Sequence, residues 1–549
     1  MLKIGKKIEV EWQLIALFLL GLIFFLVYSF LAFKLPLSWT DNPKLVLNSP
    51  DETSNLFFSH LYAYQSVPQF KDVANEIAGG LVAPRSMRVI NGQTAPASFL
   101  GLPIIYGFIA KIIGVGFIPF LTPAIAVIGL LFFYLLIKEI FNKETAFIAA
   151  LLGFILPAYW YYSTKGLFPN VAFVSFFIIA LYFFIKIIKG LGTLKPFWQL
   201  AYYGLAGVFL ALTLMVRTSE IVWIIPLFVI LAAIHWRRLR LDYLFFALIV
   251  CLLVFSPVFF INQRIYGSPL SIGYSLALEL KDKNLLEQGV TFLEKMFLPF
   301  GFNLGLIFKN LFNYTFKLFP LWTGLSLMMV ALYLLTLFSP LTFRKKNTLY
   351  LALYGLFSAY LVIYYGSWPI WDNPDPNAVT IGTSFVRYWL LPYLFILPIW
   401  AWVFSFYLKK IKYPLAVILF GVLAVNAFQL VMLDKSEGIF KVRQNLEEYQ
   451  QIAAQVVAAT ETNAVIISER MDKVFFPARR VIYKLNQPAD YQNAKKLLEN
   501  DYPVYYFNFT LNDETLRQLN ENFYEPQGLK VNQSLLDFKN QSLYPIGLK

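Results

Sequence analysis

The stretch FPNVAFVSFFIIALYFFIKIIK, residues 168–189, decides the fold class. It carries no charge before Lys186, and its last turn is basic. An α-helix rises about 1.5 Å per residue, and the hydrocarbon core of a bilayer is about 30 Å thick. The stretch therefore predicts a transmembrane helix, and other parts of the chain repeat its pattern.

Eleven apolar runs are long enough, or nearly long enough, to cross a bilayer. The 549 residues are 58% hydrophobic and only 14% charged, whereas soluble domains have about 25% charged residues. The mean hydropathy is +0.60. We therefore predict an α-helical polytopic membrane protein with about 11 transmembrane helices. The runs lie at 12–33, 121–141, 146–162, 168–189, 198–216, 219–235, 241–263, 320–342, 347–366, 385–407 and 413–433.

The formal net charge of +14 lies in short clusters between these runs. The tail, 434–549, is near neutral, with 14 basic and 15 acidic residues. A cytoplasmic N-terminus places every cluster on the cytoplasmic side of the cell membrane, as the positive-inside rule requires, and leaves the tail extracytoplasmic. This charge does not indicate a nucleic-acid partner. The clusters are Lys3/Lys6/Lys7, Lys138/Lys143, Lys186/Lys189/Lys195, Arg237/Arg238/Arg240, Arg344/Lys345/Lys346 and Lys409/Lys410/Lys412.

The apolar stretch 98–118 is expected not to cross the membrane. Pro103 and Gly114 interrupt it, and counting it as a span would invert every later loop. We interpret it as a re-entrant or juxtamembrane helix on the outer side.

The predicted domains are a transmembrane catalytic domain over 1–433 and a small α/β domain over 434–549. The first contains two large outer segments, 34–120 and 264–319. In the tail, AVIISE (464–469) and PVYYFNF (503–509) have the pattern of buried strands. Polar helical segments are predicted near 441–459 and 490–500. The tail could serve as a packing module or as a module that docks an acceptor.

Cysteine and histidine are too few for some classes of site. Cys251 is the one cysteine, which excludes an internal disulfide and a cysteine cluster. With only His60 and His235, a histidine-rich metal site is not expected.

Asp51 and Glu52 follow the first span in LNSPDETSNLFF, residues 47–58. Ser49 and Pro50 fit the N-cap and first position of a helix, and Glu52 could close a capping box. That structural explanation suits Glu52 better than Asp51. A carboxylate at a helix start beside the membrane can also act as a general base.

Cationic and polar residues gather at the predicted outer ends of other spans. Lys165 and Asn170 lie in YYSTKGLFPN (161–170), Arg217 and Glu220 in MVRTSE (215–220), and Arg387 in SFVRYWLLP (384–392). Snorkelling explains a single cation at such a place, and an ion pair explains Arg217 with Glu220. The combination of cations and acids also suits an anionic lipid head group, with a carboxylate handling a proton.

Several of these patterns resemble the GT-C superfamily of membrane glycosyltransferases, which includes protein O-mannosyltransferases and the aminoarabinose transferases of lipid A. The resemblance runs from about 40 to 400. The motifs are PDETSN (50–55), FLGLPIIYGFIAKIIG (99–114), STKGLFPNVAFVSFFIIALYFF (163–184), LTLMVRTSEIVWIIPLFVILA (212–232), SPVFFINQRIYGSPLSIGY (256–274) and RYWLLPYLFILP (387–398).

The resemblance implies an inverting hexosyl or pentosyl transferase in glycosylation of the cell envelope. The donor would be a polyprenyl-phosphate sugar, the acceptor a lipid, glycan or protein, and membrane lipids would surround both. Asp51 and Glu52 would be the catalytic pair, with Asp51 as general base. Donor phosphate and lipid would contact Arg85, Arg88, Lys165, Arg264 and Arg387, and substrate would contact Asn170, Tyr274 and Tyr388.

A divalent cation is left open by the same comparison. Asn170 stands where many members carry a second acid, so the sequence assigns no metal site. If a cation binds, Asp51 and Asn170 would be its ligands.

Two rival classes share features with the transferase, and a non-catalytic membrane scaffold is a third alternative. A polysaccharide polymerase or ligase also uses lipid-linked sugars, but usually carries its main outer loop late in the chain. A lipid-linked-sugar transporter usually has paired, interrupted segments in two related halves, a pattern that the sequence does not show.

Overall fold

The structure is a computed structural model that describes residues 11–30, 47–190, 195–273, 297–337, 345–370, 372–373, 375, 377–407 and 413–549. Tyr274 therefore lies outside the described residues. The chain forms two compact units. The first, the helical unit, comprises Met1–Leu35, Pro119–Ser256 and Lys283–Lys441. The second, the mixed unit, comprises Pro36–Ile118, Pro257–Asp282 and Val442–Lys549.

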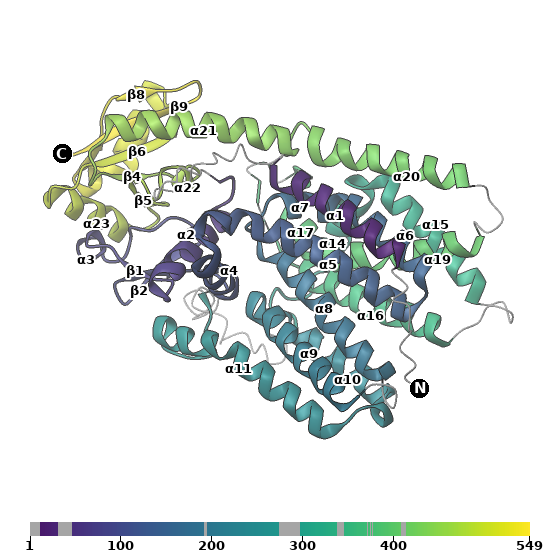
Figure 1. Cartoon of the computed structure of the whole chain (residues 1–549). Helices are drawn as coiled ribbons and strands as arrows, with labels where there is room; N and C mark the ends of the chain where they lie inside the picture. Colours follow the sequence, from purple (N-terminus) through teal and green to yellow (C-terminus); the bar gives the residue numbers. More distant parts are fainter. Residues whose placement is uncertain are drawn as a thin grey trace, which may run out of the picture. The chain divides into compact units, whose positions relative to one another are not determined.

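The helical unit contains most of the long apolar helices (Figure 1). Its described helices are α1 Trp12–Phe30, α5 Ile118–Ile140, α6 Lys143–Ile155, α7 Pro157–Thr164, α8 Pro169–Gly190, α9 Pro196–Val216, α10 Ile221–Ile234, the start of α11 Leu241–Tyr266, α14 Leu304–Leu311, α15 Pro320–Leu337, α16 Lys345–Gly366, α17 Ser384–Tyr388, α18 Leu390–Phe395, α19 Leu397–Tyr407 and α20 Tyr413–Phe428. Short 3₁₀ or π turns are η2 Thr218–Glu220, η3 Trp236–Arg238, η6 Phe312–Lys317 and η7 Gln429–Leu433.

The predicted stretch 168–189 forms α8, and 83% of its apolar window is buried within the protein. Helix α8 packs along α9. Because most of this window is buried, α8 lies in the interior of the bundle, and its apolar character on all sides suits a membrane span.

Among the described residues, seven helices are long and apolar enough to cross a membrane, or nine if two bent pairs each count as one span. The pair α6–α7 is bent by 55°. Pro157 explains this bend, because proline disfavours the α conformation of the residue before it, and Leu156 is extended with ψ 117°. The second pair, Leu304–Lys317 with Pro320–Thr336, is bent by 100°.

The predicted fold class, a polytopic helical membrane protein, is confirmed. Two of the eleven predicted spans correspond to shorter apolar helices, Thr218–Ile234 and Val417–Leu433. The stretch 98–118 contains α4, Gly101–Ile113, whose 13 residues rise only about 20 Å. This is less than the thickness of the hydrocarbon core, and the helix ends at Gly114 with φ +105°.

Two ion-pair clusters hold the basic ends of helices in the helical unit. Glu11 pairs with Lys138 at 2.7 Å and with Lys143 at 2.9 Å. Glu139 pairs with Lys186 at 2.9 Å and with Lys189 at 3.1 Å. Residues from two predicted basic clusters therefore have acidic partners.

The mixed unit combines helices with two sheets (Figure 1). Its first part contains α2 Pro50–Gln65, β1 Phe70–Lys71, α3 Ala74–Ile77, β2 Met87–Ile90, β3 Gln93–Pro96, α4 and η1 Val115–Phe117. Its last part contains most of α21 Ile439–Ala459, then β4 Val465–Ile467, α22 Asp472–Phe475, β5 Arg480–Ile482, α23 Pro488–Glu499, β6 Val504–Phe509, α24 Asp513–Leu519, η8 Asn520–Tyr524, η9 Glu525–Gln527, β7 Leu529–Val531, β8 Leu536–Asp537 and β9 Gln541–Leu548.

The tail is a small α/β fold, as predicted. The two predicted strands form β4 and β6, which pair in parallel, and the two predicted helices form α21 and α23. The strand order of the larger sheet is β5-β4-β6-β9-β7, with β8 on β9. Strands β6 and β9 pair antiparallel, so the sheet is mixed.

The first outer loop and the tail share one hydrophobic core within the mixed unit. Ala74, Ala78 and Val82 of the loop are buried against Val465 and Ile482 of the tail. Ala83 also forms a parallel bridge with Ile482, and Arg480 pairs with Asp72 at 2.9 Å. The predicted domain boundary at 433/434 stays a prediction. The predicted division assigns the first outer loop and the tail to separate domains and does not include their shared core.

Close helix contact in the helical unit gives a prediction about Gly207 of α9. A Cβ at Gly207 would lie 2.4 Å from the carbonyl oxygen of Ala247 in α11. We expect Gly207→Ala to destabilise the protein by about 1–3 kcal/mol, because the backbone of α11 must move. Thermal unfolding in detergent, followed by tryptophan fluorescence, measures the change.

Gly421→Ala in α20 is the matched control, because nothing lies within 4 Å of its added Cβ. It should be neutral or stabilise the helix by up to about 1 kcal/mol. Equal loss of stability in both variants would contradict the close contact between α9 and α11.

Candidate active site

Asp51 lies in the first turn of α2, where the local sequence determines the backbone. Ser49 is the N-cap, in an extended conformation, and Pro50 occupies the first helical position, as predicted. The Ser49 Oγ accepts a hydrogen bond from the Asp51 N–H at 3.3 Å. Acidic residues in a first turn also interact favourably with the helix dipole. Glu52 is buried, with 1% of its surface exposed, whereas Asp51 is half-buried.

Ser86 holds the Asp51 carboxylate. The Ser86 hydroxyl donates to Asp51 Oδ1 at 2.6 Å, and the Ser86 carbonyl accepts from the Ser54 hydroxyl at 3.0 Å. Asp51 and Ser54 are three residues apart and therefore share a face of α2. Both groups of Ser86 thus bind the same face of the helix, which restricts the orientation of Asp51.

The backbone at Ser86 has an unusual conformation for a residue with a side chain. Its φ is +62°, in the left-handed region, which costs a non-glycine residue about 1–2 kcal/mol. The Ala97 N–H donates to the Ser86 carbonyl at 3.0 Å. The neighbouring contacts must therefore keep Ser86 in place.

Arg85, immediately before Ser86, is clamped by the tail. Asp472 accepts from the Arg85 backbone N–H at 2.7 Å, from Nε at 3.1 Å and from Nη2 at 2.8 Å. Asp472 is fully buried, and Arg85 also lies over the ring of Tyr483. The sequence predicts Arg85 as a phosphate-binding cation, but this network indicates that Arg85 fixes the loop on the tail.

Arg88 lies in β2, two residues after Ser86 and about 7 Å further along the strand. Burial lowers the pKa of its guanidinium, and the nearby Tyr266 opposes that change. Arg88 has no ion pair among the described residues. Of the two predicted arginines of this loop, Arg88 is the better candidate for an anionic ligand.

Lys165 and Arg387 of the helical unit lie over the same aromatic ring. The Lys165 Nζ is 5.5 Å from the ring centre of Phe168, and the Arg387 guanidinium carbon is 4.4 Å from it. Arg387 Nη2 also donates to Ser384 Oγ at 2.7 Å. The second predicted outer loop and the mouth of the tenth predicted span therefore meet at Phe168.

Arg217 and Glu220 form the predicted ion pair, at 2.8 Å and almost fully buried. Arg217 Nη2 donates to the Tyr365 hydroxyl at 2.8 Å, and the Tyr365 hydroxyl donates to Glu220. Tyr388, a predicted substrate residue, stacks on Tyr365 at 4.5 Å between ring centres. The Arg217 guanidinium carbon lies 4.9 Å from the Tyr388 ring centre. This buried network supports Tyr388 from one side, while Arg387 lies over the same ring.

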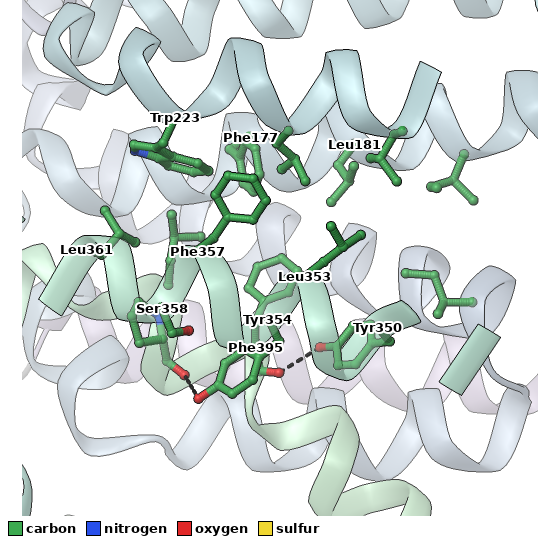
Figure 2. Close-up of a pocket in the computed structure, with 16 residues that line it drawn as sticks. Phe177, Leu181, Trp223, Tyr350, Leu353, Tyr354, Phe357, Ser358, Leu361 and Phe395 are labelled. Atoms are coloured by element: carbon green, nitrogen blue, oxygen red, sulfur yellow. Dashed lines mark hydrogen bonds between the residues drawn. The ribbon is translucent and has the colours of Figure 1, made fainter. Parts of the chain in front are cut away.

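An apolar cavity of about 120 Å³ adjoins this network in the helical unit. Figure 2 shows Phe177 and Leu181 of α8 facing Leu353 and Phe357 of α16 across it. Trp223 lines the cavity and donates its Nε1–H to Glu220 at 2.5 Å. The lining is therefore mostly apolar, and one lining residue, Trp223, contacts the buried ion pair.

The two predicted metal ligands, Asp51 and Asn170, belong to different units of the chain. Asn170 is the second residue of α8 and is 2% exposed. Within the described ranges, no three histidine, cysteine, aspartate or glutamate residues gather closely enough to hold a metal ion. Binding of a divalent cation by Asp51 and Asn170 stays a prediction.

Ser86, Asp472 and Tyr365 are contacts that the sequence interpretation missed. Ser86 lies inside APRSMRV, where the sequence pattern predicts a role only for the two arginines. No local pattern marks Asp472, which is 387 residues from Arg85. The position of Ser86 between Arg85 and Arg88, two candidate cations, was the only sequence feature that could have indicated its role.

A family model described as dolichyl-phosphate-mannose-protein mannosyltransferase matches residues 100–261. The fold is similar to the crystal structure of ArnT from Cupriavidus metallidurans bound to undecaprenyl phosphate, with a TM-score of 0.55 and 10% identity over 97% of each chain. It is also similar to the Archaeoglobus fulgidus oligosaccharyltransferase in its apo form, with a TM-score of 0.51 and 13% identity, covering 92% of this chain and 70% of that chain. The chain has a GT-C fold. No curated protein sequence matches it.

The match to the family model covers only part of the GT-C fold described above. It runs from the end of the first outer loop into α11 and includes Lys165, Asn170 and Arg217. Asp51, Ser86 and Arg387 lie outside it. The resemblance to GT-C glycosyltransferases is confirmed, while the role of each residue is still a proposal.

The clamp between loop and tail gives a prediction about Asp472. Asp472→Asn removes the charge but keeps the shape, so Arg85 loses its ionic partner. Breaking a fully buried pair costs about 3–5 kcal/mol; Arg85 is 21% exposed, so we expect about 2 kcal/mol. Amide hydrogen exchange in residues 84–97 should then be faster by about tenfold or more.

Glu447→Gln is the control, since its pair with Arg443 is exposed and should contribute less than about 1 kcal/mol. Unchanged exchange in residues 84–97 of Asp472→Asn would show that Asp472 does not hold this loop.

Proposed function

We propose that the protein is an inverting glycosyltransferase that moves a sugar from a polyprenyl-phosphate donor to an acceptor hydroxyl on the outer face of the cell membrane. The observation that carries the proposal is Asp51, a carboxylate at a helix start whose orientation is fixed by Ser86. The match of residues 100–261 to a mannosyltransferase family supports it. The similar ArnT structure holds undecaprenyl phosphate, which supports the choice of donor class.

The proposed step is a single displacement. The acceptor hydroxyl gives its proton to the Asp51 carboxylate while its oxygen attacks the anomeric carbon. The bond from that carbon to the phosphate oxygen breaks, and its electron pair leaves with the polyprenyl phosphate. One displacement on the opposite face inverts the anomeric centre. We derive no step through a metal ion.

Cations of the helical unit suit the phosphate of this donor. Lys165 and Arg387 share the Phe168 ring, and each can present N–H donors to a phosphate oxygen. Such donors stabilise the charge that develops on a departing phosphate. In the mixed unit, Arg88 is a further candidate for the same chemistry.

The apolar cavity of the helical unit suits a segment of prenyl chain. Its lining is almost entirely hydrocarbon and aromatic, so burial of an isoprenoid there is favourable at about 25 cal/mol per Å². The buried pair of Arg217 and Glu220 lies at Trp223, so a chain in the cavity would have its polar end near charged groups.

One rival function has specific support. The similar Archaeoglobus fulgidus structure is an oligosaccharyltransferase, which favours a ligase that moves an oligosaccharide instead of one sugar. The two functions differ in the mass that one transfer adds to the acceptor. For both functions we propose the same topology, with a cytoplasmic N-terminus and an extracytoplasmic tail.

Asp51 and Glu52 can be separated by isosteric variants. Asp51→Asn should fold and bind undecaprenyl phosphate, but transfer from polyprenyl-phosphate sugars should fall by roughly 100-fold or more, because an amide cannot take the proton. Glu52→Gln should fold and keep at least part of the activity. Thermal stability, lipid retention by native mass spectrometry and transfer of a radiolabelled sugar are the three measurements.

Near-normal transfer by a stable Asp51→Asn protein would remove Asp51 from the mechanism. If Glu52→Gln were inactive and Asp51→Asn active, the two roles would be exchanged.

Ser86 should act as a positioning residue for Asp51. Ser86→Gly keeps the left-handed backbone but removes the donor, so kcat should fall by about tenfold with KM little changed. Ser86→Asn tolerates the same backbone and restores a donor, so it should recover part of kcat. Steady-state kinetics of both variants measure the split between kcat and KM.

Ser66→Gly is a matched control, because Ser66 is also left-handed, with φ +59°, at the other end of α2. Its kcat should match that of the unmodified protein. A normal kcat in Ser86→Gly would show that the hydrogen bond to Asp51 has no part in the reaction.

A further inference from the structure

The mixed unit contains a polar cavity that is distinct from the surroundings of Asp51. Its volume is about 540 Å³, and its lining includes Gln65, Gln69, Phe70, Lys71, Gln93 and Arg264. Four parts of the unit supply these side chains: the end of α2, the segment around β1, the start of β3 and the end of α11.

Three carboxamides, one aromatic ring and two cations make this lining suitable for a sugar. Each glutamine amide offers both donors and an acceptor, which match the hydroxyl groups of a saccharide. Phe70 offers an apolar surface for the ring carbons. Protein sites of this kind place a few convergent polar groups beside an aromatic face.

Arg264 gives the cavity its available positive charge. Lys71 already pairs with Glu76 at 2.5 Å. The Arg264 side chain, by contrast, has no ion pair or hydrogen bond with any residue that the structure describes. A guanidinium can bind a carboxylate or phosphate through two parallel N–H bonds. The cavity therefore suits a sugar that carries an anionic group.

Two lining residues of this cavity, Gln65 and Gln93, lie far along the backbone from Asp51 and from its partner Ser86. Gln65 is 14 residues after Asp51 in α2, or about 21 Å along the helix axis. In the hairpin, Gln93 pairs with Ile90. Ile90 is four residues after Ser86, and Gln93 is four residues before Ala97, which bonds to Ser86. Gln93 is therefore about 13 Å from Ser86 along the strands. Both distances exceed the span of a single sugar ring. A donor whose anomeric carbon lies beside Asp51 would therefore not reach Gln65 or Gln93 with its phosphate.

We propose that this cavity is an acceptor subsite that binds an anionic sugar unit of an extended acceptor glycan. The proposal rests on the proposed function. It assigns Arg264 to the acceptor instead of the donor phosphate, and it makes the enzyme selective for acceptors that carry a negative charge several sugar units from the attacking hydroxyl.

Binding in the absence of donor tests the subsite without any turnover. Trigalacturonic acid is the anionic probe, maltotriose the neutral probe and inorganic phosphate the anion alone, each titrated by calorimetry into the full-length protein in detergent. We expect trigalacturonic acid to bind more tightly than maltotriose or phosphate. Arg264→Ala should weaken the binding of trigalacturonic acid by about tenfold or more, because a charge-assisted contact is lost.

Two further variants locate the effect. Gln69→Leu keeps the size of the side chain but removes its amide, so it should weaken the binding of both trigalacturonic acid and maltotriose. Arg517→Ala is the matched control on an exposed arginine of the tail, and it should bind trigalacturonic acid normally. Thermal unfolding of each variant checks that the fold is kept.

Binding of undecaprenyl phosphate separates acceptor from donor. We expect Arg264→Ala to retain this lipid in native mass spectrometry, while Arg387→Ala loses it. Loss of the lipid in Arg264→Ala, or equal binding of trigalacturonic acid to Arg264→Ala and the unmodified protein, would overturn the subsite. Phosphate that binds as tightly as the trisaccharide would overturn its selectivity for a sugar. Inactivity of Asp51→Asn bears only on the proposed reaction and leaves these binding results unaffected.

Discussion

The mixed unit depends on one buried carboxylate. Asp472 accepts three hydrogen bonds from Arg85, one of them from the backbone, and has no exposed surface. A carboxylate in such a place is stable only when its charge and lone pairs are satisfied. Arg85 is thereby fixed on the tail, and Ser86 follows directly in the chain. The orientation of Asp51 at the start of α2 is thus linked, through two adjacent residues, to a domain almost 400 residues later in the sequence.

In the helical unit, the buried charges contact aromatic rings and partners that are close in sequence. Arg217 and Glu220 are close in sequence, and the rings of Tyr365 and Tyr388 enclose their pair. Lys165 and Arg387 use the face of Phe168. Aromatic faces attract cations, so one ring brings these two positive charges together. The helical unit therefore places one arginine in a buried ion pair and two other cations on a shared aromatic face.

Local patterns explain what the sequence could predict. Hydrophobic length located the spans, Ser49 and Pro50 located the start of α2, and alternation located β4 and β6, since each depends on neighbours in the chain. The contacts of Ser86 with Asp51 and of Arg85 with Asp472 join distant segments, and no periodicity encodes them. Gly207 likewise looks ordinary in an apolar run, although the backbone of α11 leaves no room for a methyl group. The candidate site was therefore predictable as a set of residue types, but not as a set of partners.

The bridge between Ala83 and Ile482 affects how the tail behaves in solution. Strand β5 is an outer strand of the larger sheet, and Ile482 is part of it. Unpaired outer strands promote association between chains, because their N–H and C=O groups can pair with another strand. The first outer loop covers part of this edge and also buries Ala74 and Val82 against the tail. A fragment containing only the tail would expose both the edge and this apolar surface, so it would tend to aggregate in water while the same sequence in the whole chain stays protected.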